Sequence, residues 1–261
     1  MSRIATVLSS LVLAACAGRG ASPTSPPASF ADRMVAAHGG PGWYEQPAIA
    51  SDLEVEFGGA VVLAGAMVFE PRTGRCRIDL ADGGVMLFDG REAWATGGVP
   101  MPRFHVLTWP YFLGVPWKLG DPGAALAVEH DRPLGGVPHP TARLTFAAGT
   151  GDTPDDWYVL YADPQSHRLA GLAYIVTYGK TRAEAEEHPS LALYGDWTEV
   201  AGLLLPGELV LQPWSDANDP DAEPPDTEPK GRATFADLRV VVPAADAFTP
   251  PPGAVRDALP E

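Results

Sequence analysis

Imidazole and carboxylate groups that could hold a metal ion come together at one place in the sequence. His130 and His139 bound the segment HDRPLGGVPH, and Asp131 follows the first of them. Histidine nitrogens and carboxylate oxygens are common zinc ligands. Their spacing here matches no zinc motif, and a segment rich in glycine and proline is typical of a turn. We therefore predict two surface histidines and no metal site.

A second group of possible ligands lies in the acidic, proline-rich segment 215–229. Its carboxylates belong to Asp216, Asp219, Asp221, Glu223, Asp226 and Glu228. Because calcium takes about six to eight oxygen ligands, a calcium site here stays open as an alternative. The segment lacks the glycine-centred spacing of an EF-hand, and we predict a solvated, flexible loop.

Three carboxylates alternate with apolar residues along one predicted strand, at Asp52, Glu54 and Glu56. Paired carboxylates can perform general acid–base catalysis. The alternation is nevertheless typical of an antiparallel strand with one face in solvent. Arg75 and Arg77 alternate in the same way two turns later, which favours ion pairs between strands over catalysis.

The common catalytic motifs are absent from the sequence. It contains no Gly-x-Ser-x-Gly, no His-Glu-x-x-His, no P-loop and no dinucleotide fingerprint. We therefore expect no cofactor and favour a protein that is not an enzyme. A hydrolase with an unusual site stays open as an alternative, and it would need His38, His105 or His130 to approach an aspartate or glutamate.

The first 16 residues have the layout of an export signal that ends in a cysteine. Arg3 precedes the apolar stretch 4–15, and small residues lead to Cys16. The stretch is shorter than the about 20 residues that span a bilayer. Leu13-Ala14-Ala15-Cys16 resembles the lipobox of bacterial lipoproteins. The resemblance implies a signal peptide over residues 1–15 and a diacylated Cys16, with an ordinary cleaved signal as the alternative.

The residues after Cys16 bear on where the protein resides. Ala17 follows the cysteine, and the lipoprotein resemblance then implies the outer membrane, with the chain on the periplasmic side. Residues 17–28 are rich in glycine, serine and proline, a composition that cannot bury a core. We expect segment 16–28 to be a lipidated cysteine followed by a flexible tether.

The charge of the chain argues against two other kinds of binding. Eighteen Lys+Arg stand against 33 Asp+Glu, a net charge of −15. Removal of residues 1–15 takes away Arg3 alone, and 17 positive against 33 negative side chains leave −16. Because nucleic-acid phosphates are held by clusters of Lys and Arg, we expect no nucleic-acid partner. Electrostatic docking on anionic lipid is equally unexpected, so membrane attachment would depend on Cys16.

The rest of the sequence predicts one mainly β domain over residues 29–243 and a proline-rich tail over 244–261. Ser29 is a helix N-cap with Asp32 three residues on, for a short helix over 30–37. Cys76 shares the apolar side of an alternating strand with Ile78 and Leu80, which predicts a buried structural thiol. An antiparallel meander is predicted by the turn signals Gly58-Gly59, Thr73-Gly74, Asp82-Gly83 and Asp89-Gly90.

The aromatic segment 102–119 interrupts the strands. Prolines at 110 and 116 predict a short helix over about 103–109 and then an irregular apolar turn. Its aromatic residues, Trp109, Tyr111, Phe112 and Trp117, could plug the core, form a lid over an apolar cavity or form a patch that inserts into lipid. Further on, segments 157–161 and 172–178 are apolar on both faces, which requires a covering layer or cavity on each side.

The order of these elements and the motifs within them resemble the LolA/LolB-like group of envelope proteins, and most of all a family of bacterial lipoproteins within that group. The motifs are Ala36-Ala37-His38-Gly39-Gly40 with Trp43, Phe88-Asp89-Gly90 with Trp94, Tyr111-Phe112-Leu113, Pro116-Trp117-Lys118-Leu119, Asp121-Pro122-Gly123, Trp157-Tyr158-Val159-Leu160-Tyr161 and Leu205-Pro206. The resemblance implies a curved antiparallel half-barrel, with a short N-terminal helix and a helical or irregular lid over an apolar cavity.

In such a half-barrel the cavity would take a lipid or an acyl chain. As its lining or floor we predict Leu53, Val55, Phe57, Met67, Phe69, Ile78, Leu80, Met86, Phe88, Tyr161, Tyr174 and Tyr178, and as its gate Trp109, Phe112 and Trp117. Mostly apolar linings are typical of ligand pockets. The predicted function is binding of an apolar ligand beside the membrane, in the handling of envelope lipids or lipoproteins. A structural or protein-interaction module with a filled core is the alternative.

Overall fold

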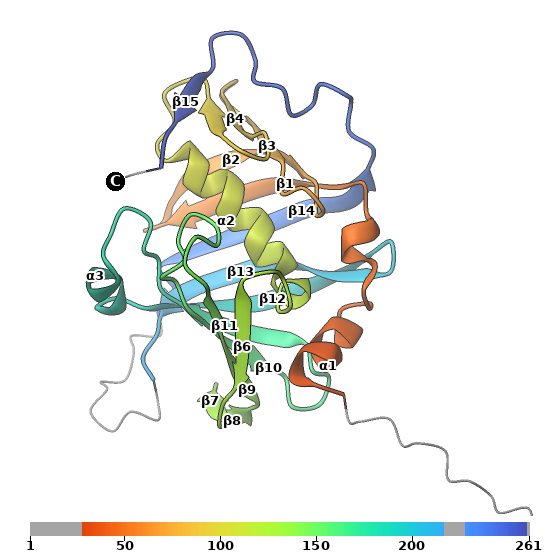
Figure 1. Ribbon diagram of the computed structural model, residues 1–261, viewed down its shortest axis with the longest axis vertical. Coiled ribbons are helices and arrows are strands. Elements are labelled where there is room, and N and C mark those ends of the chain that lie inside the picture. The colour runs from red at the N-terminus through yellow and green to blue at the C-terminus, as the bar shows by residue number, and fades with distance from the viewer. Residues whose placement is uncertain (1–27, 217–227, 260–261) are drawn as a thin grey trace, which may run out of the picture.

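Most of the strands join one open antiparallel sheet, which curves around a helix (Figure 1). The computed structural model describes residues 28–216 and 228–259. Cys16, the apolar run before it and most of the acidic segment therefore lie outside the described residues. Within the described part of the chain, no helix combines the length and the apolar character needed to cross a membrane.

The first five strands form the predicted meander. They are β1 (Ala48–Phe57), β2 (Ala60–Phe69), β3 (Cys76–Leu80), β4 (Val85–Phe88) and β5 (Ala93–Ala95). Each pairs antiparallel with the next. Gly58 and Gly59 turn the chain between β1 and β2 with φ of 57° and 77°, values that glycine adopts without steric cost. The meander prediction is confirmed.

A second series of strands extends the sheet. It comprises β6 (Ala124–Val128), β9 (Thr141–Phe146), β10 (Tyr158–Ala162), β11 (Leu169–Tyr174), β12 (Ser190–Val200), β13 (Leu203–Pro213) and β14 (Gly231–Val241). The last of these, β14, pairs with both β13 and β1, and so joins the second series to the meander.

The two edges of the sheet lie far apart in the strand order. That order is β15 (Val255–Asp257), β5, β4, β3, β2, β1, β14, β13, β12, β11, β10, β9 and β6. The edge strands β15 and β6 do not pair, so these 13 strands are not closed into a barrel. The predicted mainly β half-barrel is confirmed. The tail, which we expected outside the domain, instead contributes β15 and pairs with β5.

Strands β10 and β11 are buried on both faces, as predicted, because each face has its own covering layer. Leu160 packs in the main core, whereas Val159 and Tyr161 belong to a second cluster on the opposite face. Ala185 of α3 (Arg182–Glu186) and Leu134 cover this second cluster. Leu134 ends β7 (Arg132–Leu134), which forms a small hairpin with β8 (Val137–His139) where we predicted a loop.

Helix α1 (Phe30–Ala37) begins as predicted at a capping box, because Ser29 and Asp32 each accept the other's backbone N–H. The residue after the helix, His38, ties it to the sheet. Its Nδ1–H donates to the Met34 carbonyl at 2.7 Å, and its Nε2 accepts the Leu169 backbone N–H at 3.3 Å. Burial lowers the pKa of His38 to about 4, so the ring is neutral near neutral pH and can accept at Nε2.

The aromatic segment folds differently from the prediction. Helix α2 runs from Pro102 to Gly114 and continues through Pro110, where we expected it to stop. Proline costs the helix one backbone hydrogen bond, but burial of Trp109, Phe112 and Leu113 at 2%, 4% and 0% exposure outweighs that loss. The 3-10 helix η2 (Val115–Trp117) follows directly.

The C-terminal end of α2 is fitted closely to the rest of the core. Gly114 lies against Trp43, which belongs to the 3-10 helix η1 (Gly42–Glu45), and a methyl group in place of its hydrogen would lie 2.4 Å from Trp43 Cζ2. Trp43 stacks in turn on Trp117, with ring centroids 4.7 Å apart. Trp117 also donates from Nε1 to the Gly40 carbonyl at 2.7 Å. These contacts fix the C-terminal end of α2.

The predicted ion pairs between the acidic strand and the two arginines do not form. Arg75 pairs with Glu70, and Arg77 pairs with Asp79. The reason is topological, because β2 lies between β1 and β3 and separates the acids of β1 from both arginines. Cys76 is fully buried, as predicted, and burial raises the pKa of its thiol.

The buried His38 ring predicts acid sensitivity of the fold. In the unfolded chain this histidine is protonated below a pKa near 6.5, whereas in the folded protein the His38 ring stays neutral down to about pH 4. Stability should therefore fall as the pH drops through this window, by up to about 3 kcal/mol at about 1.4 kcal/mol per pH unit. His38→Gln should reduce the slope by about half in urea unfolding series, because burial also lowers the pKa of His105 to about 4 and that ring adds a similar contribution. His130→Gln keeps the buried ring and should retain the slope; equal slopes in both variants would contradict the prediction.

Candidate ligand cavity along helix α2

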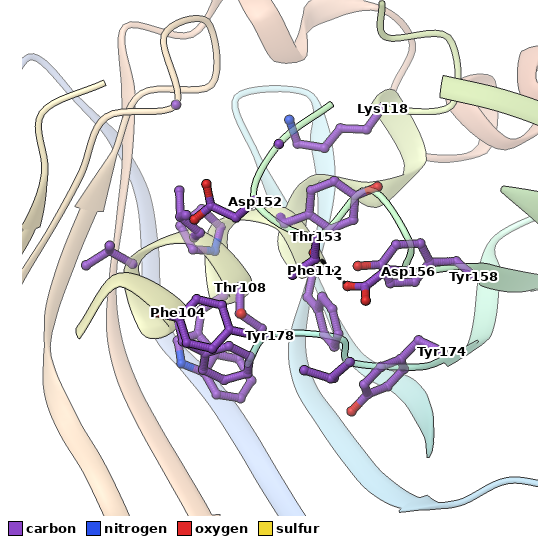
Figure 2. Close-up of a pocket in the computed structure, with 18 of the residues that line it drawn as sticks. Phe104, Thr108, Phe112, Lys118, Asp152, Thr153, Asp156, Tyr158, Tyr174 and Tyr178 are labelled. Atoms are coloured by element: carbon purple, nitrogen blue, oxygen red, sulfur yellow. Dashed lines mark hydrogen bonds between the residues drawn. The ribbon is translucent and has the colours of Figure 1, made fainter. Parts of the chain in front are cut away.

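A partly open cavity of about 550 Å³ runs along α2. The helix forms one wall with Phe104 and the residues from Val106 to Phe112, and Phe146, Tyr158 and Tyr174 of β9, β10 and β11 contribute to the opposite side. Figure 2 shows aromatic rings from both sides directed into the same space. Most of the lining is apolar, and the volume lies within the range of about 300–1,000 Å³ typical of small-molecule sites.

Seven of the fifteen residues that we expected to line or gate the cavity do line it. They are Phe57, Phe69, Phe88, Trp109, Phe112, Tyr174 and Tyr178. Trp109 and Phe112 come from the wall that α2 provides, and both are almost fully buried. The Phe112 ring packs edge-on against Tyr174, with centroids 5.1 Å apart. These aromatic residues are part of a packed wall and not of an irregular flap.

The other eight residues lie elsewhere, for three reasons. Six of them, from strands β1 to β4, pack in or against the main core instead of facing the cavity; they are Leu53, Val55, Met67, Ile78, Leu80 and Met86. Trp117 stacks on Trp43 and fixes the end of α2. Tyr161 lies on the opposite face of the sheet, where its hydroxyl accepts the Trp214 indole N–H at 2.8 Å.

Polar residues at the cavity were missed by the sequence analysis. Asp152, Thr153 and Asp156 come from the loop between β9 and β10, and Lys118 follows η2. Loop residues carry no periodicity from which their direction can be read. Lys118 and Asp156 lay within or beside motifs of the family resemblance, but nothing in their spacing indicated a role.

Asp152 links this loop to the start of α2. Its carboxylate accepts two hydrogen bonds from the guanidinium of Arg103, at 2.5 and 2.8 Å. The Arg103 backbone N–H donates to Asp257 of β15 at 2.9 Å, a favourable place for a carboxylate because helix N-termini carry partial positive charge. The pKa of Arg103 is raised by Asp152. Three separate segments thus meet at the first turn of α2.

Asp156 is a buried carboxylate whose oxygens are already occupied. Its Oδ1 accepts the backbone N–H and the hydroxyl of Thr177, both at 2.7 Å, and its Oδ2 accepts the Thr153 hydroxyl at 2.8 Å. Burial raises its pKa despite these donors. The group therefore fixes the loop to the segment after β11 and contributes a polar spot to the cavity edge.

The three histidines of the hydrolase alternative lie in separate places. His38 bonds to backbone groups, as described above. The ring of His105 accepts the Trp109 indole N–H at 3.1 Å, and burial lowers its pKa to about 4. His130 is exposed beside β7, and its carbonyl accepts the Thr141 hydroxyl. The structure therefore provides no observation in favour of a histidine–carboxylate pair at these positions.

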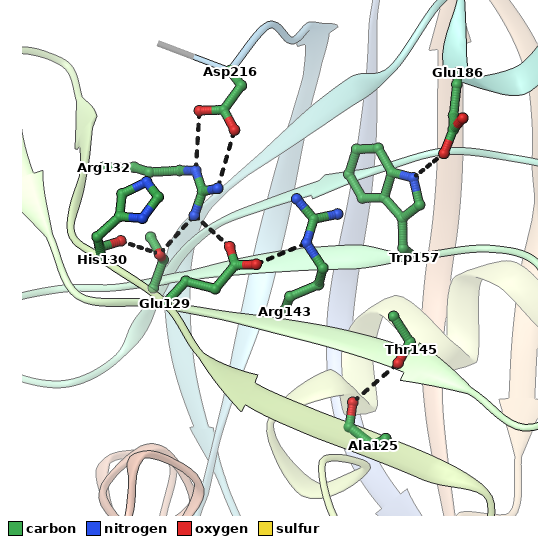
Figure 3. Close-up of polar contacts among 10 residues, drawn as sticks. Ala125, Glu129, His130, Arg132, Arg143, Thr145, Trp157, Glu186 and Asp216 are labelled. Carbon is green, nitrogen blue, oxygen red and sulfur yellow. Dashed lines mark hydrogen bonds and ion pairs between the residues drawn. The ribbon is translucent and has the colours of Figure 1, made fainter. Parts of the chain in front are cut away.

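The possible metal ligands found in the sequence have other contacts. His130 is at the surface, as predicted, but His139 is not: it is 7% exposed, and its Nδ1 bonds to the Val137 carbonyl at 2.8 Å. Arg132, almost fully buried, bonds to Asp216 and Glu129, as Figure 3 shows. Across residues 28–216 and 228–259, no group of three His, Cys, Asp or Glu side chains is placed to hold a metal ion. The rest of the acidic segment lies outside the described residues.

An open antiparallel sheet that curves around a helix, with an apolar cavity beside the helix, is the architecture of this chain (Figure 1). The fold is similar to that of a solved LolA superfamily protein. A LolA superfamily protein from Nitrosomonas europaea superposes with a TM-score of 0.52 at 8% identity, over 84% of this chain and 96% of that one. A domain named as an outer membrane lipoprotein-sorting protein, from Vibrio parahaemolyticus, gives 0.48 at 9% identity, over 84% and 94%.

Comparisons by sequence find no counterpart. No protein-family model matches the chain, and no curated protein matches it. The likeness to the solved structures is therefore one of fold.

The Arg103–Asp152 pair predicts a measurable link between the loop and α2. Asp152→Ala leaves a mostly buried guanidinium without its bidentate partner, which should cost about 1–3 kcal/mol of stability. Amide hydrogen exchange should accelerate over 150–156 and the first turn of α2. Asp155→Ala removes an exposed carboxylate from the same loop and should change stability by less than about 0.5 kcal/mol. Equal exchange in the two variants would contradict the link.

Proposed function

We propose that this protein binds an acyl chain or a similar apolar ligand in the cavity along α2, as a lipoprotein anchored in the bacterial envelope. The cavity is the observation that carries the proposal. Its aromatic walls would shield an apolar chain from water, worth about 25 cal/mol for each Å² of apolar surface covered. Its volume suits one small ligand.

The LolA-like fold supports this proposal by analogy only, because one fold can carry many different functions. The cavity itself is therefore the main support. The anchored location rests on the sequence of the first 28 residues. Two acyl chains on Cys16 would hold the protein stably at a membrane. Segment 17–28 would then act as a tether that lets the domain move away from the membrane surface. The net charge of −16 after removal of the signal disfavours electrostatic attachment to anionic lipid, so attachment would depend on Cys16.

A filled interaction module is the second candidate, and the cavity speaks against it. A packed core leaves few voids larger than one water molecule, about 30 Å³ of liquid volume. The cavity along α2 is many times larger than that. We therefore place a protein partner second to an apolar ligand.

The ligand-binding proposal is tested by filling the cavity. Val176→Trp adds an indole at the lining and should weaken binding of the uncharged fluorophore N-phenylnaphthylamine at least about tenfold. It should also remove lipids that native mass spectrometry detects on the protein incubated with an envelope lipid extract. Val128→Trp is the matched control, because Val128 is 69% exposed on the edge strand β6. If the unmodified protein binds neither fluorophore nor lipid, the proposal is wrong.

The anchor is tested with the two cysteines of the chain. Cys16→Ser removes the acylated thiol, so the protein should leave the membrane fraction and lose incorporation of labelled palmitate. Cys76→Ser alters the buried thiol and should leave both measurements unchanged. Membrane attachment that survives Cys16→Ser would rule out this anchor.

A further inference from the structure

One end of the cavity carries a hydroxyl group to which no described residue forms a hydrogen bond. Tyr111 lines the cavity, and its hydroxyl oxygen is fully buried without a hydrogen-bond partner. A buried polar group of this kind costs about 1–3 kcal/mol unless something bonds to it. Most buried polar groups in proteins are paired, so an unpaired hydroxyl at a ligand site points to a missing partner.

A cation lies against the same ring. Lys118 Nζ sits 5.6 Å from the centroid of Tyr111 and 5.9 Å from that of Tyr44. Figure 2 shows Lys118 at one end of the group of lining residues. Its side chain is 21% exposed, and burial lowers its pKa, with Asp121 opposing that effect. An ammonium group offers three donors and no acceptor.

The carboxylates nearby are committed to other donors. Asp121 Oδ2 lies 3.6 Å from Lys118 Nζ, which is an ion pair beyond hydrogen-bond length, and Asp121 Oδ1 accepts the Tyr44 hydroxyl at 2.5 Å. Asp156 accepts from Thr153 and Thr177. At this end of the cavity the Tyr111 hydroxyl has no partner and the Lys118 ammonium has one ion pair, whereas the nearby carboxylates already accept hydrogen bonds. A ligand with oxygen acceptors could bond to both donors.

We infer that the ligand is a single acyl chain with an anionic oxygen head group, a carboxylate or a phosphate, which lies against Lys118 and Tyr111 while the chain follows α2. This inference rests on the proposed function and names its ligand class. A charged acceptor suits the site because hydrogen bonds to ions are shorter and stronger than neutral ones. A cavity of about 550 Å³ favours one chain over the several chains of a larger lipid.

The experiment compares head groups on one chain length. The full chain carrying Cys16→Ser is titrated with hexadecanoate, hexadecyl phosphate and methyl hexadecanoate, each displacing N-phenylnaphthylamine. At least one anion should bind about tenfold more tightly than the methyl ester, and the preferred anion identifies the head group. Lys118→Met should weaken binding of that anion about tenfold and leave the ester unchanged. Tyr111→Phe, which removes one oxygen, should reduce the same preference about threefold.

Two controls separate the residues of the site from general effects. Lys230→Met removes an exposed lysine, and Tyr161→Phe removes a hydroxyl on the opposite face of the sheet. Both should keep the preference for the anion. If Lys118→Met does not fold, Tyr111→Phe carries the same measurement.

The outcomes distinguish the two proposals. Equal binding of anions and ester by the unmodified site, or a preference that survives both site variants, would overturn the head-group inference and leave the ligand cavity in place. Failure of all three compounds to displace the fluorophore would overturn the proposed function itself.

Discussion

The burial of α2 inside the curve of the sheet is the constraint on which the rest of the structure depends. An open sheet of this kind has an apolar concave face, and exposure of that face would cost about 25 cal/mol per Å². α2 covers the part formed by β3, β4 and β5 and stops short of filling the part next to β9, β10 and β11. The cavity is thus what remains of the concave side after one helix has been packed into it.

Both ends of α2 are held, and this decides what kind of wall the helix provides. At its start, Arg103 joins Asp152 and Asp257. At its end, Gly114 fits against Trp43, and the Tyr194 hydroxyl donates to the Phe112 carbonyl at 3.0 Å. A helix fixed in this way acts as a stationary wall.

Local patterns in the sequence were sufficient for much of the fold. The glycine turns and the capping box of α1 depend on neighbouring residues, and both were predictable. The extent of α2 was not, because Pro110 argues locally for a break that tertiary burial overrides. In the candidate site, alternation indicated which side chains are buried but not what buries them. Ile78 packs in the core and Tyr161 faces the other side, while Phe88 lines the cavity.

The pairing of β1 with β14 has a consequence for how the chain reaches its folded state. Ala48 lies opposite Val241, so the middle of the sheet joins two segments from near the opposite ends of the domain. Contacts between residues so distant in sequence form slowly, because a long loop must close before they stabilise anything. During synthesis, the meander is complete long before its partner strand exists. The full sheet therefore cannot assemble until almost all of the domain has been made.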